Sequence, residues 1–287
     1  MVACQRDFSK LSASFRSALT GTVKNQSNMK IIYFILLGLI FAFSAPAQQR
    51  PPNTSAVNYR LKIFHLKDSI QLSRVSNFLR DYFIPAAHRL GKKQIGVFTE
   101  NNPEFGTNIY LFSQLGSLDE LNTFDQQLLG DSQYAAGFSA YNAYDGKNTF
   151  YLREETIVLN AFAKMPFIEA PGLKAAKSAR VYELRSYESP TEVMGVNKIK
   201  MFNEGNEVAL FKRLNFNAVF YARVIAGNKM PNLMYMVTFE NMADHNAKWA
   251  AFKDAPEWKA LSALPEYQNN MNKVDAHFLT PMDYSDL

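Results

Sequence analysis

The stretch Arg180-Val181-Tyr182-Glu183-Leu184-Arg185-Ser186-Tyr187 decides the fold, because a degraded copy of it, Tyr59-Arg60-Leu61-Lys62-Ile63-Phe64, stands earlier in the chain. Both stretches have the residue types and alternation of a strand. Two further segments recur at nearly the same offset: residues 108–110 match 232–234, and residues 133–134 match 257–258. A nearly constant offset across three separated elements predicts that one structural unit is duplicated.

Each copy has the order strand, helix, strand, strand, helix, strand. In the first copy we expect strands at 59–65, 94–99, 108–113 and 151–162, and helices at 70–83, resuming past Pro85, and 118–136. In the second copy we expect strands at 181–187, 216–224, 233–239 and 273–279, and helices at 190–214 and 241–264. Gly205 and Pro256 are the points where these last two helices can break.

This β-α-β-β-α-β order is the split, ferredoxin-like arrangement. Both helices cover one face of a four-stranded antiparallel sheet, and the other face stays bare unless something covers it. Two tandem copies can cover each other. We therefore predict an α+β fold in which two ferredoxin-like domains, residues 58–163 and 180–287, are joined by a linker at 164–179. They pack sheet to sheet as a pseudo-dimeric barrel within one chain, whose interior is the natural ligand cavity.

The second copy also resembles a known family. Tyr182-Glu183-Leu184-Arg185-Ser186-Tyr187 is similar to the Tyr-Glu-Leu-Arg-x-Tyr signature that opens NIPSNAP domains, and residues 216–221, 231–236, 249–252 and 256–259 continue the resemblance. The first copy lacks the Glu and Arg of the signature and resembles the family only as a diverged copy. The resemblance implies a place in the dimeric α/β barrel superfamily, whose members include cofactor-free monooxygenases, isomerases and haem-handling proteins. It leaves the activity open, because this fold hosts many chemistries.

A targeting segment precedes the duplicated part. Met29-Lys30, the apolar run 31–43 and the small-x-small site Ala45-Pro46-Ala47 predict a signal peptide over residues 29–47. A membrane anchor is the alternative, but the run is shorter than the roughly 20 residues that a spanning helix needs. We expect residues 1–28 to be a non-native or disordered leader, with Met29 as the true start, or else a long extension of the signal. Residues 48–57 are expected to be a flexible lead-in. The mature protein is then exported, periplasmic or extracellular, without a stable membrane span.

The charge balance argues against a nucleic-acid partner. Of 31 basic and 26 acidic residues, five and one lie within residues 1–47, which leaves 26 and 25, a formal charge of +1. No basic field remains on average to attract a polyanion. The single cysteine, Cys4, lies in the leader, so the mature chain has no thiolate nucleophile, disulfide or cysteine–metal site. No histidines stand at metal-ligand spacing and no metal is predicted. The cofactor and the oligomeric state are left open.

Strand alternation supplies candidate residues for the cavity. If Leu184 meets the helices, its neighbours in the strand face the barrel interior. This inward set is Glu183, Arg185 and Tyr187 in the second copy. The equivalent set in the first copy is Arg60, Lys62 and Phe64. Enclosed charges must be paired or meet a ligand. These side chains therefore hold the two halves together or anchor an acidic or polar ligand; the remaining alternative is that they are simply exposed.

Two histidines complete the candidate set. His65 ends the first strand and His277 lies in the last strand of the other copy, so both can reach the cavity as a general base or haem ligand. The competing interpretation is a surface or hydrogen-bonded histidine. Two function hypotheses follow: an exported module that binds a small organic molecule or a partner through the barrel cavity, or a cofactor-independent or haem-using oxygenase or isomerase.

Overall fold

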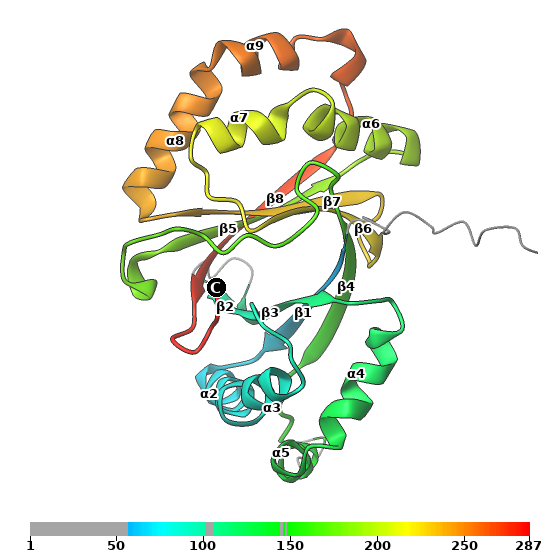
Figure 1. The fold of residues 1–287 in the computed structure, drawn as a ribbon, viewed down its shortest axis with the longest axis vertical. Coiled ribbons are helices and arrows are strands. Elements are labelled where there is room, and N and C mark those ends of the chain that lie inside the picture. Colours follow the sequence, from blue (N-terminus) through cyan, green and yellow to red (C-terminus); the bar gives the residue numbers. More distant parts are fainter. Residues whose placement is uncertain (1–56, 101–105, 144–145, 147) are drawn as a thin grey trace, which may run out of the picture. The chain divides into compact units, whose positions relative to one another are not determined.

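The computed structural model describes residues 57–100, 106–143, 146 and 148–287. In this part of the chain eight strands form a closed, antiparallel barrel in the order β1-β3-β2-β8-β5-β7-β6-β4 (Figure 1). The first half supplies β1 (Asn58–Leu66), β2 (Gly96–Glu100), β3 (Thr107–Leu115) and β4 (Arg153–Ala161). The second half supplies β5 (Val181–Glu188), β6 (Phe220–Ala226), β7 (Asn232–Phe239) and β8 (Lys273–Pro281). The two sheets join at β2–β8 and at β4–β6, which confirms the predicted pseudo-dimeric barrel.

Helices lie outside the barrel, one group on each sheet (Figure 1). The first group is α2 (Ser69–Phe78), a π-helical turn η1 (Leu79–Phe83), α3 (Ile84–Arg89), α4 (Glu120–Leu129) and α5 (Ser132–Asn142). The second group is α6 (Glu192–Asn203), α7 (Glu207–Arg213), α8 (Met242–Asp254) and α9 (Pro256–Ser262), and short 3₁₀ turns are η3 (Lys177–Ala179) and η4 (Pro265–Tyr267). Gly205 and Pro256 separate the later helices as expected. The helix expected over 118–136 divides instead, because Asp131 begins α5 by accepting a hydrogen bond from the Tyr134 amide at 3.0 Å.

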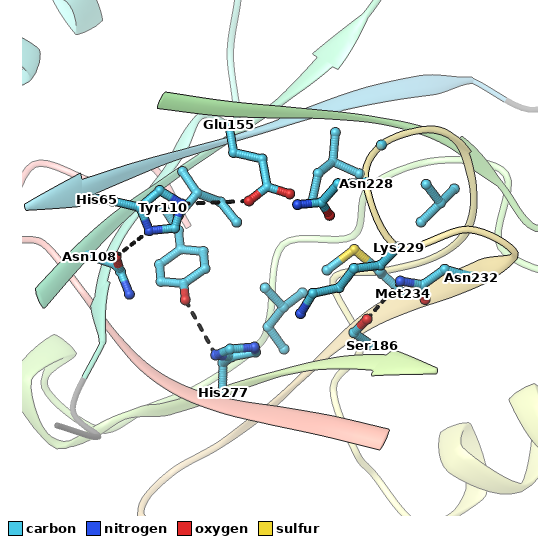
Figure 2. A pocket seen from close by; sticks show the side chains of 15 residues that line it. His65, Asn108, Tyr110, Glu155, Ser186, Asn228, Lys229, Asn232, Met234 and His277 are labelled. Carbon is cyan, nitrogen blue, oxygen red and sulfur yellow. Dashed lines mark hydrogen bonds and ion pairs between the residues drawn. The ribbon is translucent and has the colours of Figure 1, made fainter. Parts of the chain in front are cut away.

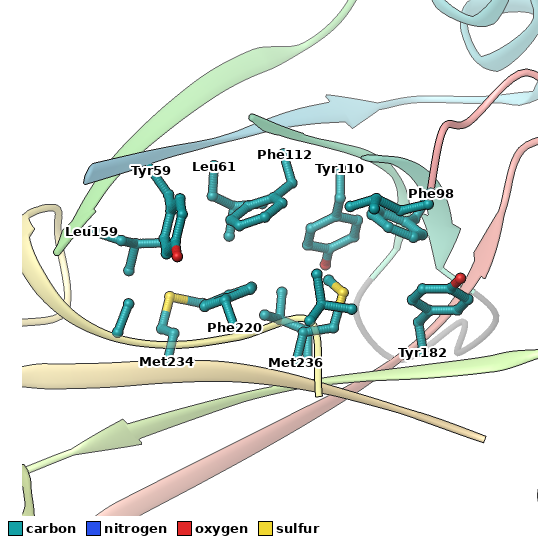
Figure 3. Packing of buried hydrophobic residues seen from close by; sticks show 14 of the residues in the cluster. Tyr59, Leu61, Phe98, Tyr110, Phe112, Leu159, Tyr182, Phe220, Met234 and Met236 are labelled. Carbon is teal, nitrogen blue, oxygen red and sulfur yellow. The ribbon is translucent and has the colours of Figure 1, made fainter. Parts of the chain in front are cut away.

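One end of the barrel is filled by side chains from both halves (Figure 3). Phe112 stacks on Phe220 across the interior with ring centroids 4.5 Å apart, and Tyr59 packs against both rings at 5.2 and 5.7 Å. Phe98 and Tyr182 form a second contact between the halves at 4.9 Å. These five rings are 0% exposed, so the two halves share a single apolar core inside the barrel.

The predicted face assignment of the strands is wrong. Tyr182 and Leu184 belong to the core inside the barrel, whereas Tyr187 belongs to the core between the sheet and helices α6–α9. Glu183 and Arg185 share that outward face with Tyr187. The physical reason is that a closed barrel covered by helices buries both faces of each sheet, so a leucine does not mark the helix side. The first copy behaves alike: Tyr59 and Leu61 point inward, and Phe64 packs under the helices.

The expected leader (1–28), the signal peptide (29–47) and all of the lead-in except Val57 lie outside the described residues. Among the helices of the described part, none combines the length and apolar character needed to cross a bilayer.

Candidate functional site

A cavity of about 220 Å³ opens at the end of the barrel opposite the filled one (Figure 2). Its walls come from β1, β3, β4, β5, β6, β7, β8 and the turn between β6 and β7. The lining residues divide into an apolar group and a polar group. The apolar group is Ile63, Ile157, Leu184, Val224 and Met234, and the polar group is His65, Asn108, Tyr110, Glu155, Ser186, Asn228, Lys229, Asn232 and His277. Both His65 and His277 therefore lie on the cavity wall.

A buried carboxylate organises the polar wall from behind. Glu100, the last residue of β2, has a side chain that is 0% exposed. One of its oxygens accepts a hydrogen bond from His277 Nδ1 at 2.7 Å. The other accepts from the Tyr110 hydroxyl at 2.7 Å and from the Asn108 amide at 3.0 Å. Three donors from β3 and β8 thus converge on one carboxylate, across the seam between the two halves.

The electrostatics of this network favour a charged Glu100. Burial on its own raises the pKa of Glu100, but hydrogen bonds from His277, Tyr110 and Asn108 outweigh burial and leave the pKa below its ordinary value of 4.5. The opposite holds for the phenol: burial first, and then the hydrogen bond to Glu100, raise the pKa of Tyr110 far above its ordinary value. At neutral pH the carboxylate is ionised and the phenol keeps its proton.

The network continues to the cavity mouth. His65 Nδ1 lies 3.0 Å from Asn108 Oδ1, and His65 Nε2 lies 3.6 Å from a Glu155 carboxylate oxygen (Figure 2). On the other side of the cavity the Asn232 amide donates to the Ser186 hydroxyl at 2.8 Å. Lys229 Nζ lies 3.0 Å from Asp275 Oδ2, so its charge has a carboxylate partner.

The two walls of the cavity are equivalent positions of the duplicated unit. Leu61 and Leu184 are equivalent positions of the two copies, so their strand partners are equivalent too. Leu61 pairs with Ile157 and Leu184 pairs with His277, which makes Ile157 the counterpart of His277. Ile63 pairs with Tyr110 as Ser186 pairs with Met234, so Met234 is the counterpart of Tyr110.

The same registers place Tyr110 beside Phe98 and Met234 beside Ala222, which makes Val224 the counterpart of Glu100. All three counterparts line the cavity. The polar triad Glu100, Tyr110 and His277 therefore has apolar residues at the equivalent positions of the other copy, which line the cavity together with the polar residues Ser186, Asn228, Lys229 and Asn232.

The signature residues build a different structure, on the helix side of β5. Glu183 is 1% exposed; its oxygens accept hydrogen bonds from Arg185 Nη1 and from Trp249 Nε1, both at 2.7 Å. His245 Nε2 lies 3.3 Å from the same carboxylate. The Arg185 guanidinium lies over the Trp249 ring at 4.6 Å. Since Trp249 and His245 belong to α8, the signature fastens α8 to the sheet within the second half and does not line the barrel interior.

The matching residues of the first copy also leave the barrel interior. Arg60 Nη1 lies 3.3 Å from Asp125 Oδ1 on α4, and Lys62 Nζ lies 2.8 Å from Glu154 Oε1 on β4. Phe64 packs against Tyr151 with ring centroids 5.6 Å apart. Arg60 therefore fastens the first-half sheet to helix α4, whereas Lys62 is paired within the sheet and Phe64 packs on the same outward face.

Sequence reasoning missed most of the polar wall. Tyr110 and Asn108 stood in the repeat match of 108–110 with 232–234, and the exchange of Tyr for Met at one position of that match is a signal that the two sites differ. Glu155 and Ser186 carry no such signal. Glu100 lies one residue past the end of the expected strand 94–99, where nothing in the sequence distinguishes a buried acid from a turn residue.

Neither metal binding nor haem binding is supported by the described residues. No cluster of three or more His, Cys, Asp or Glu side chains that could hold a metal occurs among the described residues. Pockets for drug-sized ligands occupy about 300–1,000 Å³, and a haem macrocycle is larger than most such ligands. A cavity of about 220 Å³ does not accommodate it without rearrangement.

Comparison with known proteins places the fold. Residues 182–286 match the family model described as NIPSNAP. A candidate monooxygenase from Lactobacillus acidophilus superposes with a TM-score of 0.52 at 10% identity, over 79% of this chain and 94% of that one. A candidate monooxygenase from Fusobacterium nucleatum gives a TM-score of 0.51 at 10% identity, over 80% and 94%.

An uncharacterised NIPSNAP-like domain protein from Burkholderia xenovorans is also similar, at 17% identity over 38% of this chain and 90% of that one, with a TM-score of 0.34. No curated protein matches the chain. At 10% identity the two candidate monooxygenases support the fold alone.

Proposed function

From the premise that residues 182–286 are a NIPSNAP domain in a dimeric α/β barrel, we propose that the protein binds a small organic molecule in the cavity at the barrel mouth. The observation that carries this proposal is a cavity of about 220 Å³ that is lined by Tyr110 and His277, which Glu100 holds from behind, and by the apolar residues Ile157, Val224 and Met234 at the equivalent positions of the other copy. An apolar cavity of about 150 Å³ accepts benzene. A molecule with one ring and one polar group therefore fits the size and the division of the walls.

A cavity-filling substitution tests this proposal. Val224→Phe extends a ring into the cavity and should abolish the chemical-shift changes that benzyl alcohol and toluene produce in the NMR spectrum of the unaltered protein. Val274→Phe is the matched control, because Val274 is 42% exposed on β8 and does not line the cavity. If none of a set of one-ring compounds binds the unaltered protein, or if Val224→Phe binds them equally well, the proposal is wrong.

A second candidate function is acid–base catalysis on the bound molecule. The observation that favours it is the carboxylate–imidazole pair of Glu100 and His277, joined at 2.7 Å on the cavity wall, since a carboxylate that holds an imidazole in one orientation is a recurrent device of general-base sites. Such a reaction would be a proton transfer that needs no cofactor. The discriminating measurement is exchange of ligand hydrogens with D₂O, which His277→Gln should remove without removing binding.

We propose that this binding takes place after export. The support is the apolar run 31–43 with its positive start and the small residues Ala45 and Ala47, at the spacing of a cleavage site. The mass of the protein recovered from its producing cells tests this, because cleavage before Gln48 removes a defined N-terminal segment. Recovery of a chain that still begins at Met1 or Met29 would contradict export through a cleaved signal.

A further inference from the structure

We propose that the cavity selects ligands whose polar end is a hydrogen-bond donor, an N–H or O–H group on a small apolar ring. The inference rests on the proposed function, because it names the chemical class of ligand for the same cavity. It follows from the direction of the hydrogen bonds in the polar wall, which the three contacts of Glu100 determine.

Glu100 sets that direction because an ionised carboxylate only accepts hydrogen bonds. The Tyr110 hydroxyl has one hydrogen, and at 2.7 Å from Glu100 Oε2 that hydrogen is used. The Tyr110 oxygen can therefore only accept further hydrogen bonds; one contact comes from Asn108, and the remaining lone-pair side is offered to the cavity. Its contact with His277 Nδ1, at 3.4 Å, is longer than an ordinary hydrogen bond and does not alter this assignment.

The orientation of the Asn108 amide in turn determines which nitrogen of His65 carries a hydrogen. Because the Asn108 amide nitrogen donates to Glu100, its oxygen Oδ1 is the atom that faces His65 Nδ1 at 3.0 Å. An amide oxygen only accepts, so His65 carries its hydrogen on Nδ1. Tyr110, Asn108 and His65 thus each donate away from the cavity, toward Glu100.

The charged residues of the cavity wall also favour a ligand that donates a hydrogen bond. Glu155 adds a carboxylate to the cavity mouth beside His65, and its proximity contributes to the raised pKa of Tyr110. Figure 2 shows the cationic Lys229 on the Asn232 side of the cavity. Its Nζ lies 3.0 Å from the Asp275 carboxylate, which partners its charge. Two acceptors, Tyr110 and Glu155, therefore await the polar end of a ligand that enters at the mouth.

The apolar counterparts determine the other end of the ligand. Val224, Ile157 and Met234 are the duplicates of Glu100, His277 and Tyr110, and they line the same cavity. A ring that lies against them directs its substituent to the acceptor side. A buried acceptor without a donor costs free energy, so a ligand that ends in a carboxylate is rejected there and a purely apolar one leaves the acceptors unmatched.

Four probes of one size test the inference: benzyl alcohol, benzylamine, toluene and benzoate. With the unaltered protein we expect both donors to bind roughly three- to tenfold more tightly than toluene, which is the ratio that one hydrogen bond supplies, and benzoate to bind most weakly. Isothermal titration or NMR titration gives the four dissociation constants. Equal binding of toluene and benzyl alcohol, or tightest binding by benzoate, overturns the inference and leaves the proposed function standing. Absence of binding by all four overturns the proposed function.

A substitution locates the effect. Tyr110→Phe removes one acceptor and keeps the ring, so the preference for benzyl alcohol over toluene should fall toward one while toluene affinity changes little. Tyr59→Phe is the matched control: Tyr59 is buried at the filled end of the barrel, away from the cavity, and its hydroxyl has no hydrogen-bond partner in the described part of the chain. A preference that survives in Tyr110→Phe, or falls equally in both variants, contradicts the assignment to Tyr110.

Discussion

At the scale of single residues, Glu183 has a different role in the structure from the one that its sequence context suggests. An acid in a strand that pairs with a nearby arginine invites the interpretation of a ligand anchor. The contacts of Glu183 with Arg185, Trp249 and His245 make it the fastening of helix α8 instead. Residue type and strand alternation gave the correct grouping of these side chains. They could not show whether the group faces the barrel interior or the helices, because both faces of the strand are buried in this barrel.

The pH dependence of stability should reveal this fastening. Burial lowers the pKa of His245, but the contact with Glu183 outweighs it, and the net pKa lies above the ordinary 6.5. A raised folded-state pKa means that the charged histidine contributes stability below about pH 6.5 and loses it as the pH rises through the folded-state value. We expect the free energy of unfolding to decline over that interval, by more than it does in His245→Gln.

The measurement is urea denaturation at a series of pH values from about 5 to 9, with slopes compared between the two proteins. Glu183 does not obscure the comparison. Burial raises the pKa of Glu183, but its contacts with His245 and Arg185 lower it by more, so the net pKa lies below 4.5. Its contribution is therefore lost only at more acidic pH. An identical slope in the unaltered protein and His245→Gln would show that the histidine is not charged against Glu183 in the folded protein.

At the scale of elements, most of the secondary structure could be predicted, and the misses have local causes. The strand expected to begin at 216 begins at Phe220, because Asn215 and Asn217 adopt left-handed φ values of 55° and 46°. An extended strand does not include such residues. A left-handed asparagine is typical of the residue that follows a helix end, so the conformation of Asn215 after α7 follows a general rule. No such rule predicts the second left-handed residue, Asn217, since asparagine also occurs in strands.

Helix α8 depends on its cap as well as on the signature. The Asn241 side chain accepts a hydrogen bond from the Asp244 amide at 3.0 Å and satisfies a donor that the helix leaves unpaired. We expect Asn241→Ala to lower the free energy of unfolding by about 1 kcal/mol and Asn241→Ser to change it much less, because serine also caps. Chemical denaturation of the three proteins gives the answer. Equal losses for alanine and serine would mean that the cap hydrogen bond contributes nothing.

At the scale of the whole molecule, duplication explains both what could be predicted and what could not. The nearly constant repeat offset predicts two ferredoxin-like units, and packing of their uncovered sheet faces against each other predicts the barrel. The cavity depends on the opposite property, the places where the copies differ. The sequence repeat already aligns Tyr110 with Met234, whereas the strand registers are needed to align His277 with Ile157. A sequence comparison that asks where two copies diverge at equivalent inward positions would have found Tyr110.

A shared interior also makes the two halves one folding unit, and this yields the last prediction. Phe112 of the first half stacks on Phe220 of the second at 4.5 Å, and both are fully buried. We expect Phe112→Ala to cost about 3–5 kcal/mol. Both tryptophans, Trp249 and Trp258, lie in the second half. Their fluorescence should nevertheless report the lower midpoint, coincident with the loss of circular dichroism from the whole chain.

The pair also allows a double-mutant cycle across the seam. If the rings interact directly, Phe112→Ala and Phe220→Ala together should cost less than their separate effects combined, by about 0.5–1.5 kcal/mol beyond the shared loss of buried area. Tryptophan fluorescence that keeps its midpoint in Phe112→Ala, while circular dichroism resolves a separate, earlier transition, would show two independent domains. The barrel interior would then be a contact between folded units rather than one core. Since the polar wall joins Tyr110 on β3 to His277 on β8 across the seam through Glu100 on β2, its geometry would then depend on how firmly that contact is held.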